Sequence, residues 1–351
     1  MTKPPARYLV SFAVTLIVLA VLYTGLFVYQ LGAPVEAEYW VYDVKIAKLF
    51  LGGRAEGERV VIVGGSSALF GIDSGLIERE TGMRTVNLAV HAGLSLPYLF
   101  EDAKPILRPR DIVIVPLELE YYARDYSDSP NVWFLNNIMA WDTGYFWKLG
   151  LLEKARFFLA VSAKRVVNGA IAQMYEATLR RTHGRLVRDP AVVTREARGF
   201  WEAKAYLGEP AVYSLRNLDE RGDMQNNRGT HYTGPWGSLL ELPFAYSSKI
   251  WGDLESFADY CRRHDIALFV AWPAITKGPA FDSGNPLVRR NTEAIVSHLE
   301  KAGIGTLGRP RDYLLDRVYF FDSEYHLNEE GRTIHTQQLL RDLKEALGKG
   351  R

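Results

Sequence analysis

The chain is short of cysteine, of basic runs and of net charge of either sign. Cys261 is the single cysteine among 351 residues, which excludes any disulfide within the chain, and a lone cysteine of this kind is expected to be a small, buried apolar residue. The formal net charge is only +1, and no lysine-rich or arginine-rich stretch occurs. Because nucleic-acid-binding proteins concentrate positive charge in such stretches, we predict no nucleic-acid partner.

Signatures of bound metals and nucleotides are also missing. No cluster of histidines and carboxylates has the spacing of a metal site, so we predict no metal. The glycine pair Gly64-Gly65 follows an apolar run. It lacks both the later glycine of a dinucleotide fingerprint and the lysine of a phosphate loop. The sequence therefore predicts no cofactor.

Only one apolar run is long enough to cross a membrane. Residues 9–31 carry no charge and would span about 34 Å as a helix, against about 30 Å for a bilayer core. Lys3 and Arg7 precede the run, so the positive-inside rule places residues 1–8 in the cytoplasm and the chain after residue 32 outside. The run predicts a transmembrane signal anchor in the lipid bilayer. A cleaved signal peptide is the alternative, although its apolar core is usually only about 7–15 residues.

A juxtamembrane segment, residues 32–56, follows the predicted anchor. Aromatic and aliphatic side chains recur at helical spacing over residues 36–51, which predicts a helix ended by Gly52-Gly53. This helix either packs against the base of the next domain or lies at the membrane interface. Tyr39, Trp40 and Tyr42 favour the second interpretation, because tyrosine and tryptophan collect at the headgroup level.

Residues 57–351 alternate between short apolar runs and helical patterns. The first run, 60–63, consists of four β-branched residues, which is typical of a strand buried on both faces of a parallel sheet. This rhythm predicts an α/β domain with a doubly wound, mostly parallel sheet. The expected strands are 59–63, 84–90, 112–116, 266–272 and 303–307, and the expected helices are 73–80, 95–107, 247–264, 288–302 and 328–347.

An insertion at about 120–245 interrupts the α/β pattern. Residues 125–145 are rich in aromatics and turn formers and predict a packed loop region. Residues 146–182 have helical periodicity and are basic, and residues 208–237 are loop-like. Because insertions at the carboxyl edge of a sheet commonly shape the site there, this segment is expected to border the site.

Two polar motifs carry the candidate chemistry. Gly65-Ser66-Ser67 stands where the first strand ends, and ligands bind at this edge of open α/β sheets. A serine on a sharp strand-to-helix turn is exposed beside backbone N–H groups, as an acyl-transfer nucleophile requires. Near the other end of the chain, Asp322 and His326 stand in a segment that continues Leu327-Asn328-Glu329-Glu330-Gly331. This histidine is a candidate general base.

Together the two motifs resemble the SGNH (GDSL-like) hydrolase superfamily. The resemblance is closest to its membrane-anchored branch, which includes the alginate O-acetylation proteins and the D-alanyl transfer protein of teichoic acid modification. It covers roughly residues 57–125 and 250–347 and leaves out the middle. The resemblance implies a flavodoxin-like sheet and a Ser-His-Asp acyl-enzyme mechanism.

The resemblance assigns three catalytic roles. Ser67 would be the nucleophile, and Ser66 would replace it if Gly64-Gly65-Ser66 were the true register. His326 would take the serine proton and return it to the leaving oxygen. Asp322 would fix the histidine tautomer, but it stands one residue further from His326 than in the family pattern. Glu324 or another acid is therefore an alternative partner for the histidine.

The oxyanion hole follows the family pattern only in part. The backbone N–H of Ser67 is one expected donor, and Gly93 fits the second block of the family. The third block is missing, because Pro116-Leu117-Glu118 stands where the family has Gly-x-Asn-Asp. Asn87 is a candidate substitute, with capping of a turn as its alternative role, and His91 is expected to line the site. Loss of an oxyanion donor costs about a hundredfold or more in rate.

A loop in the insertion holds candidate sugar-binding residues. Tyr232 and Trp236 offer flat faces on which pyranose rings stack, and His231 lies beside them. Local packing of the loop is the alternative explanation. The remaining histidines are expected at the surface: His183, His264, His298 and His335.

The expected function is that of a membrane-anchored, extracytoplasmic acyltransferase. It would transfer an acyl group, most simply acetyl, to hydroxyls of an exported polysaccharide. It would reside in the inner membrane, with its catalytic domain on the periplasmic side. The resemblance implies a membrane-bound O-acyltransferase as partner. The alternatives are a polysaccharide deacetylase or esterase and a non-catalytic SGNH-like subunit of a modification or export complex.

Overall fold

The computed structural model describes residues 6–123, 131–179, 188–204, 206, 213–234, 248–277 and 284–349. The chain divides into two compact units. The helical unit comprises Met1–Tyr39 and Ser129–Arg188, and the sheet unit comprises Trp40–Asp128 and Asp189–Arg351. The two segments of each unit come from separate parts of the sequence.

A five-stranded, all-parallel sheet forms the centre of the sheet unit. Its order is β2-β1-β3-β4-β6, and each predicted strand is present. The first and third strands are fully buried because their β-branched residues face helices on both sides. The strand bounds are β1 Arg59–Ile62, β2 Arg84–Asn87, β3 Ile112–Pro116, β4 Ala267–Ala271 and β6 Gly305–Thr306.

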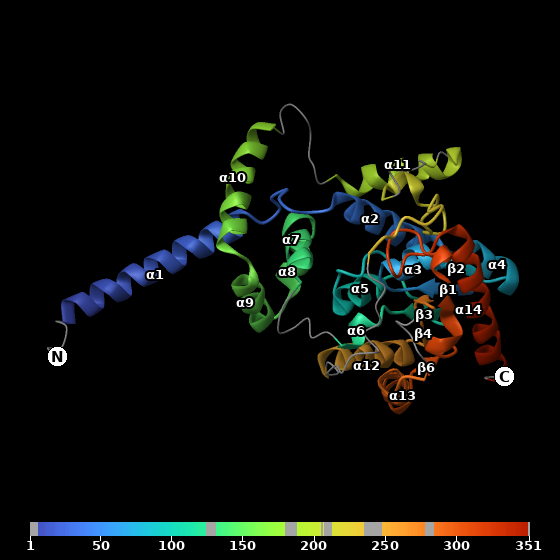
Figure 1. Cartoon of the computed structure of the whole chain (residues 1–351). Helices are drawn as coiled ribbons and strands as arrows, with labels where there is room; N and C mark the ends of the chain where they lie inside the picture. Colours follow the sequence, from blue (N-terminus) through green and yellow to red (C-terminus); the bar gives the residue numbers. More distant parts are fainter. Residues whose placement is uncertain are drawn as a thin grey trace. The chain divides into compact units, whose positions relative to one another are not determined.

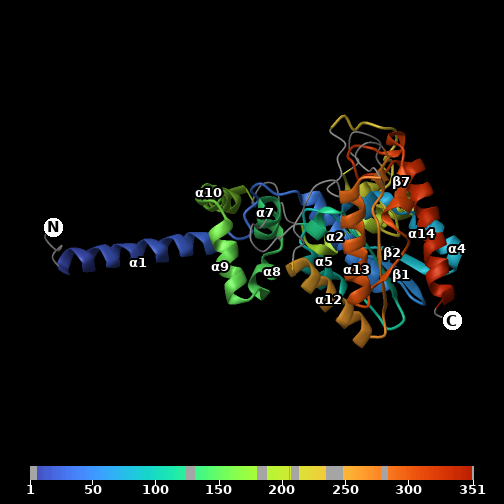
Figure 2. The same ribbon diagram turned by 60° about the horizontal axis from the view of Figure 1, so that its bottom comes forward.

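Helices cover both faces of this sheet (Figures 1 and 2). Helix α14 (Glu329–Lys349) contacts α3 (Ser66–Gly71) and α4 (Ser74–Thr81), whereas α12 (Ser248–Arg263) contacts α5 (Leu96–Ala103) and β4. The other elements of this unit are α2 Tyr39–Arg54, α6 Glu120–Ala123, α11 Pro190–Ala203, α13 Pro286–Lys301, the strand pair β5 Ile275–Thr276 and β7 Leu314–Leu315, and 3-10 turns at Leu215–Asn217, Pro310–Tyr313 and Arg317–Tyr319.

Local sequence signals explain where α4 begins and ends. The side chain of Asp73 accepts a hydrogen bond from the Leu76 N–H at 2.8 Å, which caps the amino end of the helix. Gly82 follows the helix with φ of +72°, a left-handed conformation that glycine adopts without a steric cost. Both signals were readable in the sequence, and the predicted helix is confirmed.

A buried ion pair fixes the amino ends of β1 and β3. Arg59 is fully buried, and its guanidinium donates to both carboxylate oxygens of Asp111, with an Nε–Oδ1 distance of 2.9 Å. The same side chain donates to the backbone carbonyls of Gly52 at 2.8 Å and Ile106 at 2.9 Å. Because each charge has its partner, this end of the sheet tolerates burial of an arginine.

Helix α2 packs against the sheet unit with its aliphatic face. Val41, Tyr42 and Val44 are buried, and Trp40 contacts the rings of His91 and Tyr213. The predicted helix is confirmed. Tyr42 is buried against the protein, which contradicts the membrane-interface interpretation for that residue, whereas Trp40 is only half-buried.

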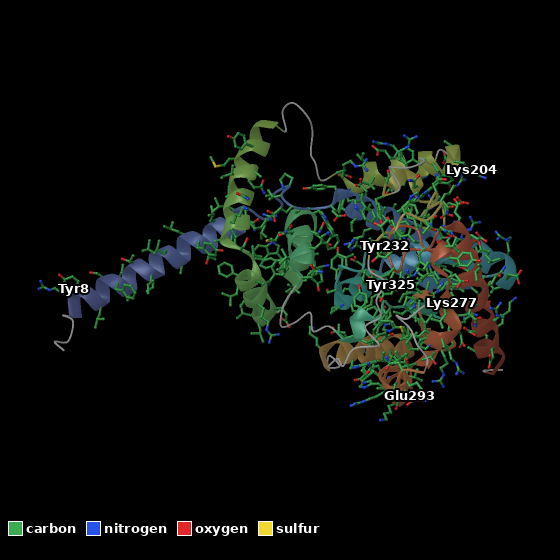
Figure 3. The ribbon with its side chains drawn as sticks, viewed as in Figure 1. Tyr8, Lys204, Tyr232, Lys277, Glu293 and Tyr325 are labelled. Atoms are coloured by element: carbon green, nitrogen blue, oxygen red, sulfur yellow. The ribbon has the colours of Figure 1, made fainter. Side chains whose placement is uncertain are left out.

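In its described residues, the helical unit contains one long apolar helix and four shorter ones. Helix α1 (Ala6–Tyr29) has a mean hydropathy of 2.4 over its span Arg7–Tyr29, which is consistent with a signal anchor or a signal sequence. Its side chains, including Tyr8, project outward (Figure 3). The shorter helices are α7 Val132–Trp141, α8 Thr143–Lys148, α9 Leu151–Ala160 and α10 Ala163–Leu179.

The interval predicted to be a packed loop region contains helix α7. Its residues 132–141 are apolar apart from Asn136 and Asn137, and Asn131 caps its amino end by accepting from the Trp133 N–H at 2.9 Å. The loop prediction is therefore wrong for residues 132–141. The aromatic residues at 132–141 belong to an apolar helix with an asparagine cap.

Candidate active site

The two serines stand at the carboxyl end of β1, where they begin α3. Ser66 is 7% exposed and Ser67 is 4% exposed. In the described part of the chain, the hydroxyl oxygen of Ser67 has no hydrogen-bond partner. Buried hydroxyls are normally hydrogen-bonded, so Ser67 stands out as a buried nucleophile-type side chain that the fold itself does not use.

Glu118 lies directly on the start of α3. It follows β3, and its Oε1 accepts a hydrogen bond from the Ser67 N–H at 2.8 Å. Gly65 makes this approach possible, because a Cβ at that position would lie 2.5 Å from the carboxylate oxygens. The carboxylate therefore occupies the N–H that was expected to serve as an oxyanion donor. It comes from the same post-β3 segment in which the family's asparagine block is missing.

Asp322 and His326 form the pair that the sequence predicted. Asp322 Oδ1 lies 2.8 Å from His326 Nδ1. Burial opposes ionisation of Asp322, but the hydrogen bonds from His326 and Tyr213, together with the charge of His326, lower the pKa of its carboxyl below the usual value. An ionised Asp322 at Nδ1 leaves Nε2 of the imidazole to act as the base.

Tyr213 is a third member of this group that sequence reasoning missed. Its hydroxyl donates to Asp322 Oδ2 at 2.6 Å and lies 3.1 Å from His326 Nδ1. The ring also packs against Trp40 and Phe70, with centroids 5.1 and 5.5 Å apart. Tyr213 belongs to the loop-like part of the insertion, residues 208–237, so the sequence held no signal for its position.

Phe70 connects the histidine to the serine. Its ring is stacked on that of His326, with centroids 4.5 Å apart and planes 28° apart. Ser67 and Phe70 are three residues apart on α3, and residues at this spacing are neighbours on a helix surface, about 5–6 Å apart at Cβ. His326 therefore contacts α3, the helix that contains Ser67, through Phe70, and among the described residues no hydrogen bond joins His326 to Ser67.

The other predicted oxyanion donors have partners of their own. The Gly93 N–H donates to Nδ1 of His91 at 2.9 Å. The Asn87 side-chain amide donates to the Ala68 carbonyl and to Asp223 Oδ1, both at 3.0 Å, and its oxygen accepts from the Ala89 N–H. Asn87 thus anchors α3 through the Ala68 carbonyl.

A turn from the inserted segment packs against the end of β2. Gly222 has φ of +90°, and a Cβ there would overlap the carbonyl oxygen of Asn87, so only glycine fits this position. The Arg221 carbonyl accepts from the Asn87 N–H at 2.8 Å. Met224 and Leu218 on either side of the turn are fully buried. This part of the insertion belongs to the core beneath the site.

Two buried carboxylates in this turn have raised pKa values. Burial, reinforced by the charge of Asp223, raises the pKa of Asp219 to about 7, and burial raises that of Asp223 although it accepts from the Ser74 N–H at 2.6 Å. Lys48 lies nearby, and burial lowers the pKa of its ammonium to about 7 against the opposing charges of Asp223 and Asp219. The carboxyl end of the sheet therefore holds ionisable groups that burial destabilises in their charged forms.

The candidate sugar-binding loop lies beside the histidine loop. The N–H groups of His231 and Tyr232 both donate to the Phe321 carbonyl, and the Tyr232 hydroxyl donates to Glu324 Oε2 at 2.8 Å. Glu324, the alternative partner for the histidine, is thus engaged by Tyr232, which Figure 3 labels. Trp236 lies outside the described residues.

The burial of Cys261 and His335 tests two further predictions from the sequence. Cys261 is buried, as predicted. His335 is not a surface residue: it is 3% exposed and lies between the carbonyl oxygens of Gly71 at 2.9 Å and Trp272 at 3.2 Å. Burial lowers its pKa to about 4. The polar residues around it in α14 hid this inward-facing position from sequence reasoning.

Comparisons with known proteins leave this site without a named relative. No protein-family model matches the chain, and no curated protein matches it significantly. Among the described residues, no three histidine, cysteine or carboxylate side chains are grouped so that they would hold a metal ion. Any functional conclusion therefore rests on the fold and on the geometry given above.

Proposed function

We propose that the chain is a membrane-anchored SGNH-like acyltransferase that acts outside the cytoplasm. The observation that carries the proposal is Asp322 holding His326 at 2.8 Å, with the His326 ring stacked on Phe70 of α3, the helix that contains Ser67. The strand order supports it. Counted along the chain it is 2-1-3-4-5, the order of flavodoxin-like doubly wound sheets, in which ligands bind beside the first and third strands. Ser67 and Glu118 follow those two strands.

The reaction would proceed through an acyl-enzyme. Ser67 Oγ attacks the carbonyl carbon of an acyl donor while His326 Nε2 takes the serine proton. The imidazolium, stabilised by ionised Asp322, returns that proton to the departing oxygen. A polysaccharide hydroxyl then attacks the acyl-serine and gives its proton to His326. The acyl–Oγ bond breaks, His326 returns the proton to Ser67 Oγ, and the polysaccharide ester departs. Acetyl is the simplest acyl group for this route.

Glu118 must leave the Ser67 N–H before the oxyanion can take its place. A carboxylate and a developing oxyanion repel each other, and this repulsion is strong away from bulk water. Replacement of the charge by an amide (Glu118→Gln) therefore tests the assignment. We expect roughly tenfold faster acylation of Ser67 in Glu118→Gln, because one opposing charge is removed.

Location and partners follow from the apolar helix and the resemblance. In this proposal residues 9–31 cross the inner membrane and the sheet unit lies on the periplasmic side. A membrane-bound O-acyltransferase would supply the acyl group, and an exported polysaccharide would receive it. Tyr232, His231 and Trp236 would contact that acceptor. Support for the anchor is the length and the apolarity of α1.

A non-catalytic SGNH-like subunit is the second candidate, and one observation favours it. Both expected backbone donors are engaged within the protein, Ser67 by Glu118 and Gly93 by His91. In such a subunit the site would bind a partner or polymer without turnover. Ser67→Ala would then leave polymer modification intact.

The test uses the full chain in lipid nanodiscs with an activated acetyl ester and an oligosaccharide acceptor. Mass spectrometry follows the acyl-enzyme, with Ser67→Ala and Ser66→Ala as matched variants. An adduct on Ser67 that passes to the sugar supports the transferase. Rapid release to water alone would indicate a deacetylase or esterase. A folded protein without an adduct, equal to Ser67→Ala, would contradict the catalytic proposal and favour the non-catalytic subunit.

A further inference from the structure

The helical unit buries a pair of polar side chains and exposes long runs of apolar ones. Arg165 is only 2% exposed, and its Nη1 donates to Gln30 Oε1 at 2.7 Å. Gly169 leaves room for this pair, because a Cβ there would lie 2.6 Å from both groups. Gln173 donates to the Leu31 carbonyl at 2.9 Å. Water-soluble domains rarely bury an arginine, although apolar side chains such as Phe157 and Val166 fill much of the rest of this interior.

Exposed apolar side chains form a stripe on each of two helices. On α9, Leu151 is 86% exposed and Leu159 is 80% exposed; with Ala155 between them, the spacing of four residues places them on one face. On α10, the exposed residues are Val167, Ile171, Met174 and Tyr175, again at spacings of three to four. Contiguous exposed apolar surface of this kind marks a surface that is covered by another apolar phase.

These helices pack around the carboxyl-terminal part of α1. Phe158 of α9 contacts the rings of Tyr23 and Phe27, with centroids 5.3 and 4.8 Å apart, and α10 also contacts α1. Figures 1 and 2 show α8, α9 and α10 at this end of α1, with its amino-terminal half projecting alone.

The positions of these contacts along α1 indicate how deep α9 would lie in the bilayer. Tyr23 and Phe27 lie six and two residues before Tyr29, the last residue of α1, hence about 9 and 3 Å below its end. A span of about 30 Å of hydrocarbon takes up nearly the whole helix. Phe158, which contacts both residues, then lies at hydrocarbon depth, and Leu159 beside it faces outward at a similar level.

The charged residues near the stripes are mostly basic, as expected beside the headgroups of a bilayer. Lys154 lies over the ring of Trp147, 5.8 Å from its centroid, and Lys148, Arg156 and Lys164 lie close by in sequence with Glu153 as the single acid between them. Tryptophan and long basic side chains occur at the headgroup level, where they contact anionic lipids.

We propose that α9 and α10 lie in the outer leaflet of the bilayer, with their apolar stripes against lipid. The stripes lie on helices that pack against α1, the proposed membrane span, which is why we assign them lipid rather than a second copy or a partner protein. This inference rests on the anchor in the proposed function. It assigns the membrane-interface role to the segment from Trp147 to Tyr175.

The experiment places fluorescent labels on single cysteines in the full chain. Variants Leu159→Cys and Met174→Cys report on the stripes, Val18→Cys on α1, and Glu293→Cys on the exposed surface of α13 (Figure 3). Cys261 is buried, so the folded wild type supplies the unlabelled baseline. Each protein is placed in nanodiscs of phosphatidylethanolamine and phosphatidylglycerol that contain doxyl lipids, and iodide is the aqueous quencher.

We expect doxyl quenching at positions 159 and 174 to exceed that at 293 about fivefold, because interfacial helices bury their apolar faces about 5–10 Å deep. Iodide should quench only position 293. Iodide quenching at 159 and 174 equal to that at 293 would overturn the inference, and so would protection from both quenchers, which would indicate a protein partner or a second copy. If position 18 also escaped doxyl lipid, the anchor itself would be wrong, and the inference would fall with it.

Discussion

The two ends of the parallel sheet bury charge in opposite ways. At the amino end, Arg59 and Asp111 satisfy each other, and backbone carbonyls take the remaining guanidinium hydrogens. At the carboxyl end, Asp219 and Asp223 lie together with raised pKa values, and a carboxylate, Glu118, covers the Ser67 N–H. The first end contributes stability. The second holds perturbed groups of the kind that cluster at functional sites.

Asp322→Asn gives the largest expected effect and acts only at the carboxyl end. The amide would reverse the polarity of the contact with His326 Nδ1 and favour the wrong tautomer, so we expect the acyl-transfer rate to fall by roughly 10³–10⁴-fold. Steady-state kinetics of the full chain measure this loss. Glu324→Gln is the matched control, and a comparable fall in that variant would move the role of orienting acid to Glu324.

Asp111→Ala tests the opposite end. It leaves the buried Arg59 charge without its carboxylate, so we expect the free energy of unfolding of the sheet unit to fall by about 3–5 kcal/mol. Hydrogen exchange of the β1 and β3 amides measures the change. Glu101→Ala, which breaks the exposed pair with Lys104, should cost less than about 1 kcal/mol. Equal losses in the two variants would remove the distinction between the buried pair and a surface pair.

Asp219→Asn tests the carboxyl end of the sheet through the pH dependence of its stability. The folded-state pKa of Asp219, about 7, lies above its usual value of 3.8. The native protein therefore binds this proton more tightly than the unfolded chain does, and the stability from it is present at low pH and lost as pH rises through about 7. Relative to wild type, Asp219→Asn should gain stability as pH rises from about 4 to about 7, by at most about 1.4 kcal/mol per pH unit, and the difference should be constant above that range.

Denaturation of both proteins at several pH values checks this slope. Asp73→Asn is a useful control, because it changes an aspartate that caps a helix at the same end of the sheet. A constant difference in stability between wild type and Asp219→Asn across this pH range would show that Asp219 is not held in a charge-disfavouring environment.

Tyr213→Phe gives the smallest expected change. The variant loses one hydrogen bond to Asp322, worth about 1 kcal/mol, and thus roughly a fivefold rate. Because this bond helps to lower the pKa of Asp322, the acid limb of the pH–rate profile should move to higher pH. Tyr232→Phe, which loses a bond to Glu324 instead, should leave that limb in place. A shift in both variants would point to a general effect on the loops.

The parts predicted best from sequence were those with local physical causes. The β-branched run after Arg59 and the caps at Asp73 and Gly82 act within a few residues, so strands and helices were predicted close to their observed positions. Tyr213 and the Asp219–Asp223 turn were missed because their positions depend on contacts with residues more than a hundred positions away. His335 was misjudged for the same reason: only the packing of α14 shows that it faces inward.

The residue types of the candidate site could be predicted from the sequence, but the contacts between them could not. Asp322 and His326 followed from the resemblance, although their spacing is one residue longer than in the family pattern, whereas Glu118 was seen only as a departure from that pattern. Its contact with the Ser67 N–H depends on the absence of a side chain at Gly65 and on the neighbouring positions of β1 and β3. Sheet neighbours of this kind become visible only in three dimensions.

The most direct test of the central claim is the reaction of the full chain with a fluorophosphonate, an irreversible probe of activated serines. The adduct is mapped by mass spectrometry in wild type, Ser67→Ala and His326→Gln. If Ser67, His326 and Asp322 act as one catalytic set, the adduct forms on Ser67 in wild type and is absent from both variants. No adduct on a folded wild type, or equal labelling of wild type and His326→Gln, would contradict that account.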